Sequence, residues 1–334
     1  MPTLRPLRLL RQVLDSCFTE RGEEGAGAAP LQRLRIFRLA FFLKEVNAVI
    51  ESQEHTGAAA RIDANVLACM RYRHYLSKNF TLRQRVESMA GHIRYEAASY
   101  RPAYRIAVNF ADGLALWSRM VDGVHYGIRL VKAHDNLYEG QRSVVLCVGE
   151  QRICVMSFSY VDAAIFGLPS ESLLFVTRNQ SDAGSDAKAL FVGTFKQNYP
   201  SYFCLAAVSG IAMANGMTRV AAVKPRAQVA YEPQRAAGFE WSYGTFWNTF
   251  HAADLDAQAV LLPIPLELRP VPDIKSKHRQ RARERRKHWA EVRDSAWAAT
   301  SSMRLSDAAP GLPRPGASVP SPHPADVRAS ERVG

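Results

Sequence analysis

The densest chemical signal in the sequence is a basic run over residues 275–293, KSKHRQRARERRKHWAEVR. It holds nine Lys and Arg residues against Glu284 and Glu291, a composition that suits contact with phosphate or an anionic surface. At helical spacing the charges surround the helix, and Ala282 and Trp289 supply little apolar face. We therefore predict a solvated or phosphate-neutralising helix. Nucleic acid is a less favoured partner, because the run lacks aromatic interleaving.

Few other residues are spaced for chemistry. The pairs His125 with His134 and Cys147 with Cys154 are the ones close enough to consider for a metal. Apolar neighbours make the two cysteines better candidates for inert core thiols, so we expect no metal. The motifs G-x-x-x-x-G-K-[ST], G-x-G-x-x-G, G-x-S-x-G and H-E-x-x-H are absent from the sequence. The sequence thus lacks the motifs on which common nucleotide-binding, hydrolase and zinc-protease mechanisms depend.

The composition is that of an ordinary globular protein. The chain has 334 residues, of which 47% are apolar and 22% charged, which excludes wholesale disorder, a collagen-like fibre and a disulfide-dense secreted scaffold. The net charge is +12, and the basic run alone carries +7 of it. The rest of the chain therefore carries too little net charge for the strong positive field that is typical of nucleic-acid-binding proteins. Five cysteines without a CxxC pair favour a reducing cytosol.

The sequence predicts neither a membrane span nor a secretion signal. The longest apolar stretch near the N-terminus, residues 39–43, lies between Arg38 and Lys44. It is far shorter than the ~20 residues of a spanning helix. Arginines interrupt the opening residues, which therefore lack the apolar core of a signal peptide. We expect a cytoplasmic protein without a transmembrane segment.

The first part of the chain has the hydrophobic period of helices. Residues 31–50 form an apolar stripe that suits a docking helix. Thr81 and Gln84 have the spacing of a capping box at the start of a second helix over 82–98. We assign to core packing the apolar face of that helix, which comprises Leu82, Val86, Met89, Ile93 and Ala97.

From residue 104 the pattern becomes that of β-strands. The pairs Asp112-Gly113 and Asp122-Gly123 separate apolar runs and favour type I′ hairpin turns. A further hairpin turns at Gly149-Glu150. Because two-residue turns join antiparallel strands, we expect a largely antiparallel sheet formed by residues 104–111, 114–121, 124–133, 143–148, 151–161 and 171–178.

The next segment predicts one βαβ unit. Residues 189–195 and 218–223 are buried apolar runs, and residues 202–215 have the pattern of a helix that ends at Gly216. A right-handed crossover would make the two strands parallel. The fold class is therefore α+β, a largely antiparallel sheet flanked by helices with one C-terminal βαβ unit. The Pro-rich tail, 301–334, is expected to be disordered.

The segments RYRHYLSKNFTLRQRVESMAGHIRY and EGQRSVVLCVGEQRICVMSFSYV begin a series of short ordered motifs. The first resembles the entry motif and Arg-Gln-Arg helix of the VirK/YbjX family of Gram-negative bacterial proteins, and the second resembles its double-strand signature. FVGTFKQNYP, NGMTRVAAVKP, YGTFWNTF and SKHRQRARERR follow in the family's order. The resemblance covers residues 64–297. It implies one domain over 61–300 between an N-terminal helical extension, 1–60, and the tail.

The resemblance implies an accessory role. Members are associated with envelope integrity, virulence and resistance to antimicrobial peptides, and their biochemical activity is undefined. The implied partner is an envelope-related protein or an anionic lipid, which would place the protein peripherally at the inner membrane. His92 is a candidate for catalysis. The candidate binding residues, from the family motifs and the basic run, are His74, Glu139, Gly193, Lys196, Lys277, Arg279 and Arg281.

A second resemblance keeps an enzyme hypothesis open. The predicted βαβ unit, followed by Ala236-Ala237-Gly238-Phe239, is similar to the central strand, helix and closing segment of the N-acetyltransferase superfold. That resemblance implies acyl-CoA as the candidate cofactor, with its pyrophosphate at the helix start. It also implies Tyr231 or Tyr243 as the acid that protonates the leaving thiolate. Two hypotheses therefore stand, an envelope accessory protein and an acyl-CoA-dependent acyltransferase.

Overall fold

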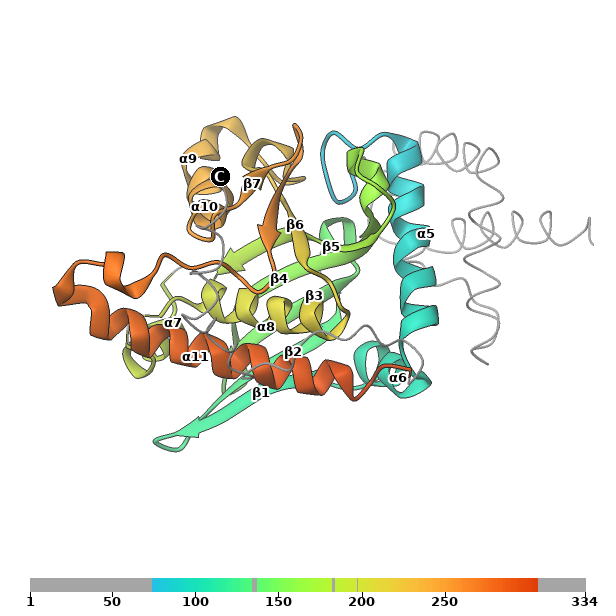
Figure 1. The fold of residues 1–334 in the computed structure, drawn as a ribbon. Coiled ribbons are helices and arrows are strands. Elements are labelled where there is room, and N and C mark those ends of the chain that lie inside the picture. The colour runs from blue at the N-terminus through green and yellow to red at the C-terminus, as the bar shows by residue number, and fades with distance from the viewer. Residues whose placement is uncertain (1–73, 134–136, 182–183, 197, 306–334) are drawn as a thin grey trace, which may run out of the picture.

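A single mixed sheet organises the protein (Figure 1). The computed structural model describes residues 74–133, 137–181, 184–196 and 198–305. The strand order is β1-β2-β3-β4-β5-β6-β8-β7, and every neighbouring pair is antiparallel except β5 with β6. The α+β class is confirmed. The strands are β1 (Leu114–Val121), β2 (Val124–Lys132), β3 (Arg142–Val148), β4 (Gln151–Asp162), β5 (Ser172–Ser181), β6 (Arg219–Val223), β7 (Ala253–Asp254) and β8 (Ala259–Pro263).

Helices flank this sheet. Helix α8 (Pro200–Ala214) packs on β3, β4 and β5, and α11 (Ser276–Ser301) packs on α8 and β1 (Figure 1). Helix α5 (Leu82–Ser99) lies against β4, and α6 (Pro102–Phe110) against β2 and β1. The other elements are short: α7 (Asp186–Thr194), α9 (Ala236–Phe239), the π-helical turn η7 (Glu240–Thr245), α10 (Phe246–Asn248), and the 3-10 turns η3 (Leu137–Glu139), η4 (Ala163–Phe166), η5 (Pro225–Ala227), η6 (Pro233–Arg235) and η8 (Val271–Asp273).

Some of the expectations concern residues outside those ranges. The extension over 1–60, its docking helix and residues 306–334 of the tail lie outside the described residues. Within the described ranges, no helix combines the length and apolarity needed to cross a bilayer.

Most local sequence signals are confirmed, but the hairpin turn predicted at Asp112-Gly113 is wrong, because this pair joins helix α6 to strand β1. The side chain of Thr81 accepts a hydrogen bond from the backbone of Gln84, whose own side chain bonds back to Thr81, as a capping box requires. Asp122 and Gly123 have φ of 50° and 76° and join β1 to β2, which fits the expected type I′ turn. The hairpin at Gly149-Glu150 joins β3 to β4.

The strand predicted over 104–111 is wrong, because this segment forms α6. Pro102 occupies the first turn, where proline favours a helix. The helix buries Tyr104 and Val108, four residues apart, and leaves Ile106 and Phe110 exposed. Alternate apolar residues at 104, 106, 108 and 110 fit both periods, so the pattern alone did not separate strand from helix.

The strand predicted over 189–195 is also wrong, because these residues belong to α7 and its C-terminal end. The crossover exists, but β5 supplies its first strand. Strand β5 pairs in parallel with β6 through Leu174–Val220, Phe175–Ala221 and Val176–Ala222. Helices α7 and α8 both lie in the connection. The predicted helix over 202–215 and strand over 218–223 are confirmed as α8 and β6.

A glycine sets the distance between α8 and α11. Gly210 lies on the buried face of α8, and a Cβ there would lie 2.2 Å from the carbonyl oxygen of Arg293 and 2.9 Å from the backbone nitrogen of Trp297. Backbone atoms cannot rotate out of the way. The two helices are therefore in contact through their main chains at this point, and any side chain would push them apart.

We predict that Gly210→Ala lowers the free energy of unfolding by about 1–3 kcal/mol, the usual effect of overpacking a core. The measurement is urea unfolding followed by circular dichroism. Gly193→Ala is the matched control, because Gly193 is also helical and a Cβ there meets no atom within 4 Å. The control should keep or gain stability, by up to about 1 kcal/mol. Equal midpoints for the two variants would contradict the close contact.

Candidate functional site

An open groove of about 980 Å³ lies between α7 and the first half of α11. Four of the predicted binding residues line it. Gly193 and Lys196 lie at the end of α7, and Lys277 and Arg281 lie one turn apart at the start of α11. Residues that are far apart in the sequence therefore meet on one surface.

Two features orient helix α7 so that one of its faces lines the groove: a capped first turn and a buried side chain on the opposite face. The side chain of Ser185 accepts a hydrogen bond from the backbone nitrogen of Lys188 at 3.3 Å, which caps the helix. Phe191 is fully buried and holds the opposite face against the core. Ala189 and Val192, which share a face at helical spacing, consequently line the groove.

The groove is positively charged. The Nζ atom of Lys196 lies 3.1 Å from Oε2 of Glu284 and joins the two walls. The hydrogen bond from Lys196 lowers the pKa of Glu284. Lining side chains of both signs leave a formal surplus of two positive charges, from the cations Lys188, Lys196, Lys277 and Arg281 and the carboxylates Asp186 and Glu284.

Two arginines of the basic run support the segment before α11. Arg279 donates to the carbonyl oxygens of Ile274 at 2.8 Å and Pro272 at 2.7 Å. Arg286 donates to the carbonyl oxygen of Arg269. Arg279, which was predicted to bind a ligand, thus holds the turn that leads into the helix and does not line the groove.

The other two predicted binding residues also lie apart from the groove. His74 is bonded through Nδ1 to the carbonyl oxygen of Lys78 at 3.1 Å. Glu139 is buried, with Oε2 3.4 Å from Nε of Arg178, and it accepts a hydrogen bond from Gln228. Among the described residues, no group of three or more His, Cys, Asp or Glu side chains is arranged to hold a metal ion.

The three candidate catalytic residues do not converge on an open site. Tyr231 and Tyr243 pack against Phe239, with ring centroids 5.3 and 5.9 Å away. The hydroxyl of Tyr243 is buried and accepts a hydrogen bond from the backbone nitrogen of Asn179 at 3.2 Å. Burial raises the pKa of Tyr243 above its ordinary value. His92 lies on α5, in a different cluster.

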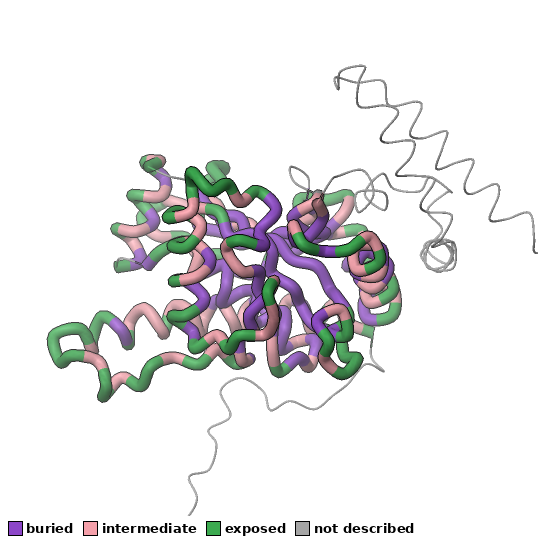
Figure 2. The backbone as a smooth tube through the Cα atoms, turned by 90° about the horizontal axis from the view of Figure 1, so that it is seen from above, coloured by how far each residue is buried: buried purple, intermediate pink, exposed green. Residues whose placement is uncertain are grey.

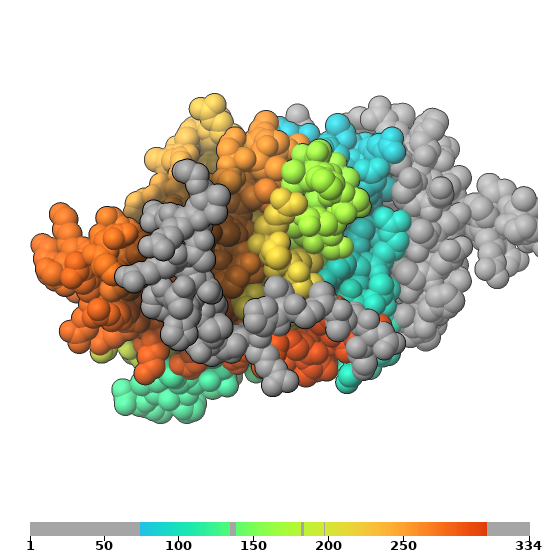
Figure 3. Space-filling model, in the orientation of Figure 1, coloured from blue at the N-terminus to red at the C-terminus, as the bar shows by residue number. Residues whose placement is uncertain are grey.

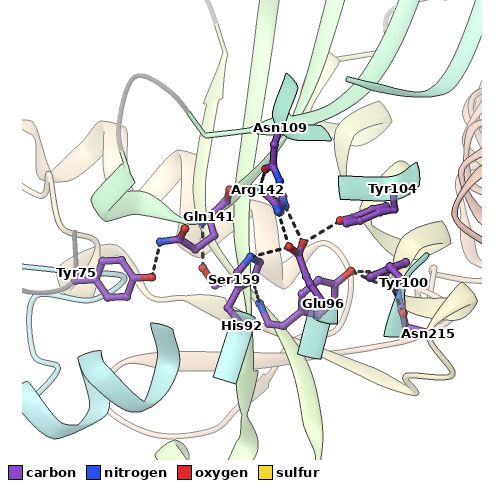
Figure 4. Close-up of polar contacts among 11 residues, drawn as sticks. Tyr75, His92, Glu96, Tyr100, Tyr104, Asn109, Gln141, Arg142, Ser159 and Asn215 are labelled. Carbon is purple, nitrogen blue, oxygen red and sulfur yellow. Dashed lines mark hydrogen bonds and ion pairs between the residues drawn. The ribbon is translucent and has the colours of Figure 1, made fainter. Parts of the chain in front are cut away.

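His92 belongs to a buried polar network that joins α5 and α6 to β3 (Figure 4). Nε of Arg142 donates to Oε1 of Glu96 at 2.7 Å. The hydroxyl of Tyr104 donates to the same oxygen at 3.0 Å, and Nη1 of Arg142 donates to Asn109 at 3.0 Å. Glu96 is 4% exposed and Arg142 6%, so this ion pair is shielded from water and its groups satisfy one another.

The tautomer of His92 follows from its partners. Its Nδ1 accepts a hydrogen bond from the backbone nitrogen of Tyr160 at 3.1 Å, which places the proton of the neutral ring on Nε2. Nε2 lies 3.5 Å from Oε2 of Glu96, without a hydrogen bond. Burial lowers the pKa of His92 from 6.5 to about 4; Glu96 opposes this shift and Arg142 adds to it.

Glu96 keeps its charge despite burial. Burial alone would raise its pKa, but Arg142, His92 and the hydrogen bonds from Arg142 and Tyr104 together hold the pKa below its ordinary value. A second set of bonds continues the network. The hydroxyls of Tyr100 and Tyr160 lie 2.6 Å apart, and both contact Asn215 at the end of α8. The network therefore fixes the positions of helices, and Asn215 also lines a pocket of about 230 Å³ together with Tyr95 and Arg219.

The sequence pattern missed this network, because the buried face of α5 is rotated from the predicted one. Val86 and Met89 are buried as expected, but Leu82 and Ile93 are only half buried, and His92 and Glu96 occupy the core side. The i, i+4 spacing of His92 and Glu96 is a signal that could have identified the pair. Arg142 carries no such local signal.

Fold and groove together define a mixed α+β protein with a basic groove on its surface. The family model described as "Protein of unknown function (DUF535)" matches residues 34–296. The chain belongs to this family. A comparison with curated proteins gives no match.

We predict that Glu96→Gln lowers the free energy of unfolding by about 3–5 kcal/mol, because it leaves the charge of Arg142 buried without a counter-charge. Urea unfolding at pH 7 measures this. Glu87→Gln is the control on the same helix. Glu87 forms an exposed pair with Arg83 at 2.7 Å, and its loss should change stability by about 0.5 kcal/mol or less. Similar losses in both variants would contradict a buried ion pair.

We also predict that His92 makes the free energy of unfolding depend on pH. An unfolded histidine takes up a proton near 6.5, whereas His92 in the folded protein does so only near pH 4. Proton uptake therefore stabilises the unfolded state as the pH falls through this window. The free energy of unfolding decreases by about 3 kcal/mol. His92→Asn keeps an acceptor for the Tyr160 nitrogen but cannot titrate. Wild type should lose about 3 kcal/mol more than this variant between pH 7 and 4. Parallel curves of unfolding free energy against pH would exclude this role.

Proposed function

We propose that the protein is a non-enzymatic accessory protein of envelope homeostasis, related to VirK/YbjX proteins and to their association with virulence and antimicrobial-peptide resistance. It docks reversibly on anionic lipid at the cytoplasmic face of the inner membrane. The observation that carries this proposal is the exposed, cationic first half of α11. This end projects from the body, as Figure 2 shows by its exposed residues and Figure 3 by its outline.

The two halves of α11 differ in environment. The second half buries Val292, Ala296 and Thr300 against the rest of the protein, whereas in the first half only Ala282 is buried. The sequence predicts charged residues on every side of this helix. In the structure, only the first half exposes nearly all of its sides. Lys277, Arg281, Arg283 and Lys287 are exposed and have no carboxylate within ion-pair distance among the residues that the structure describes.

The expected strength is modest. Each Lys or Arg near an anionic bilayer contributes about 1 kcal/mol, so the four exposed cations supply roughly 4 kcal/mol. That corresponds to a dissociation constant of about 1 mM. Binding of this strength is reversible and suits a protein that moves between the cytoplasm and the membrane surface.

An acyl-CoA-dependent acyltransferase is the second candidate function. The parallel pair β5 and β6, joined through α7 and α8, favours it, because acyl-CoA binding in the N-acetyltransferase superfold uses such a crossover. However, β5 continues to Ser181 beyond its pairing with β6, and there Asn179 contacts Tyr243 and Ser242. Tyr243 and the backbone of Ser242 therefore cover this part of β5. Calorimetric titration with acetyl-CoA and a long-chain acyl-CoA separates the two candidates.

We predict that the wild-type chain co-sediments with phosphatidylglycerol vesicles at low salt, and not with phosphatidylcholine vesicles. Binding should weaken as salt rises, because the attraction is electrostatic. A variant in which Lys277, Arg281, Arg283 and Lys287 are all Gln should lose binding and keep its melting temperature, since these side chains are exposed.

The control removes the same number of charges from other surfaces. It replaces with Gln four exposed arginines outside α11, namely Arg94, Arg101, Arg152 and Arg226. This variant should still bind phosphatidylglycerol vesicles. Equal loss in both variants would mean that net charge alone, and not α11, drives binding. A deletion of 275–293 is unsuitable, because it removes the buried Val292 together with the cations.

A further inference from the structure

We propose that the groove between α7 and α11 binds the headgroup of an anionic lipid that ends in a phosphate monoester, as in phosphatidic acid. This inference rests on the proposed membrane docking and adds a specific ligand site to it. Diffuse attraction requires only charge on α11, whereas the groove places cations from two different helices around one volume of about 980 Å³, within the size range of small-molecule sites.

The donors in the groove suit phosphate. Arg281 presents a planar guanidinium that can donate two parallel hydrogen bonds to phosphate oxygens. Lys277 lies one turn before it on the same wall and can reach the same group as a point charge. Both are exposed. Lys196 lies at the opposite wall but is held by Glu284 at 3.1 Å, so it shapes the groove and contributes less net charge.

The charge surplus selects the kind of phosphate. The lining side chains leave two formal positive charges. A phosphate monoester carries about −1.5 to −2 at neutral pH and balances that surplus, whereas a diester headgroup carries one negative charge. Charge complementarity of this kind favours the monoester and rejects ligands with unbalanced charge.

The floor and rim of the groove favour a lipid over a free anion. Ala189 and Val192 form an apolar strip along α7, and Gly193 adds no side chain there. Leu190, on the same helix, is 45% exposed. An exposed leucine beside a basic groove is well placed against the acyl region of a bilayer, with the headgroup held by α11.

The test is calorimetric titration of the full chain with dihexanoyl phosphatidic acid, a short-chain lipid used as a dissolved monomer. Dihexanoyl phosphatidylglycerol and inorganic phosphate serve as the diester and lipid-free probes. We expect one molecule of phosphatidic acid per chain, with an affinity at least about tenfold above either of the other probes.

Two variants isolate the groove. Gly193→Leu adds a side chain where no atom lies within 4 Å of the new Cβ, so it fills the groove without disturbing the core. Lys277→Gln with Arg281→Gln removes the phosphate donors. Both variants should weaken phosphatidic acid binding at least about tenfold. The matched control is Arg283→Gln with Lys287→Gln, which removes two exposed cations of the same helix that do not line the groove.

The outcomes separate this inference from the proposed docking. If the two double variants lose phosphatidic acid binding equally, or if Gly193→Leu binds as wild type does, the groove is not the site, while vesicle docking through α11 stands. If inorganic phosphate binds as tightly as phosphatidic acid, the groove takes a free anion and the lipid assignment is wrong. If vesicles do not bind but the groove variants still lose phosphatidic acid, the docking proposal fails and the site remains.

Discussion

The contact between α8 and α11 is the constraint on which the position of the cationic groove depends. At Gly210 the two backbones approach so closely that one additional carbon would overlap the carbonyl of Arg293. Helix α8 is itself buried on β3, β4 and β5, and Trp289 stacks on Tyr202 with ring centroids 4.9 Å apart. The second half of α11 is therefore fixed on the core. Its first half extends past this layer, where its cations face α7 and solvent.

The buried network around Glu96 has a different role. An ion pair in the core contributes little net stability compared with apolar side chains of similar volume, but one charge left without its partner is strongly destabilising. Glu96 is satisfied by Arg142 from β3 and Tyr104 from α6. The ion pair and its hydrogen bonds therefore form in one arrangement of α5 and α6 on the sheet. Other arrangements would leave a buried charge unpaired.

The polar groups singled out by the sequence divide into a buried set and a set that lines a surface groove. Tyr243 and His92, the buried candidate catalytic groups, are engaged with backbone nitrogens of β5 and β4, at Asn179 and Tyr160. The larger groove, between α7 and α11, presents Lys188, Lys196, Lys277 and Arg281 together with Asp186 and Glu284. The surplus of positive charge gives that groove a field that attracts anions, whereas the side chains of Tyr243 and His92 are buried.

The sequence by itself determined the elements whose signals are local. The capping box at Thr81 and Gln84, the turn at Asp122-Gly123 and the helix that ends at Gly216 each depend on residues within a few positions. It did not separate helix from strand at α6 and α7, where short apolar runs fit both periods. Only the tertiary structure decided which charges are buried and which meet in the groove. Glu96 and Arg142 are 46 positions apart, and Lys196 meets Glu284 across two helices, because long-range packing, which no local spacing encodes, brings them together.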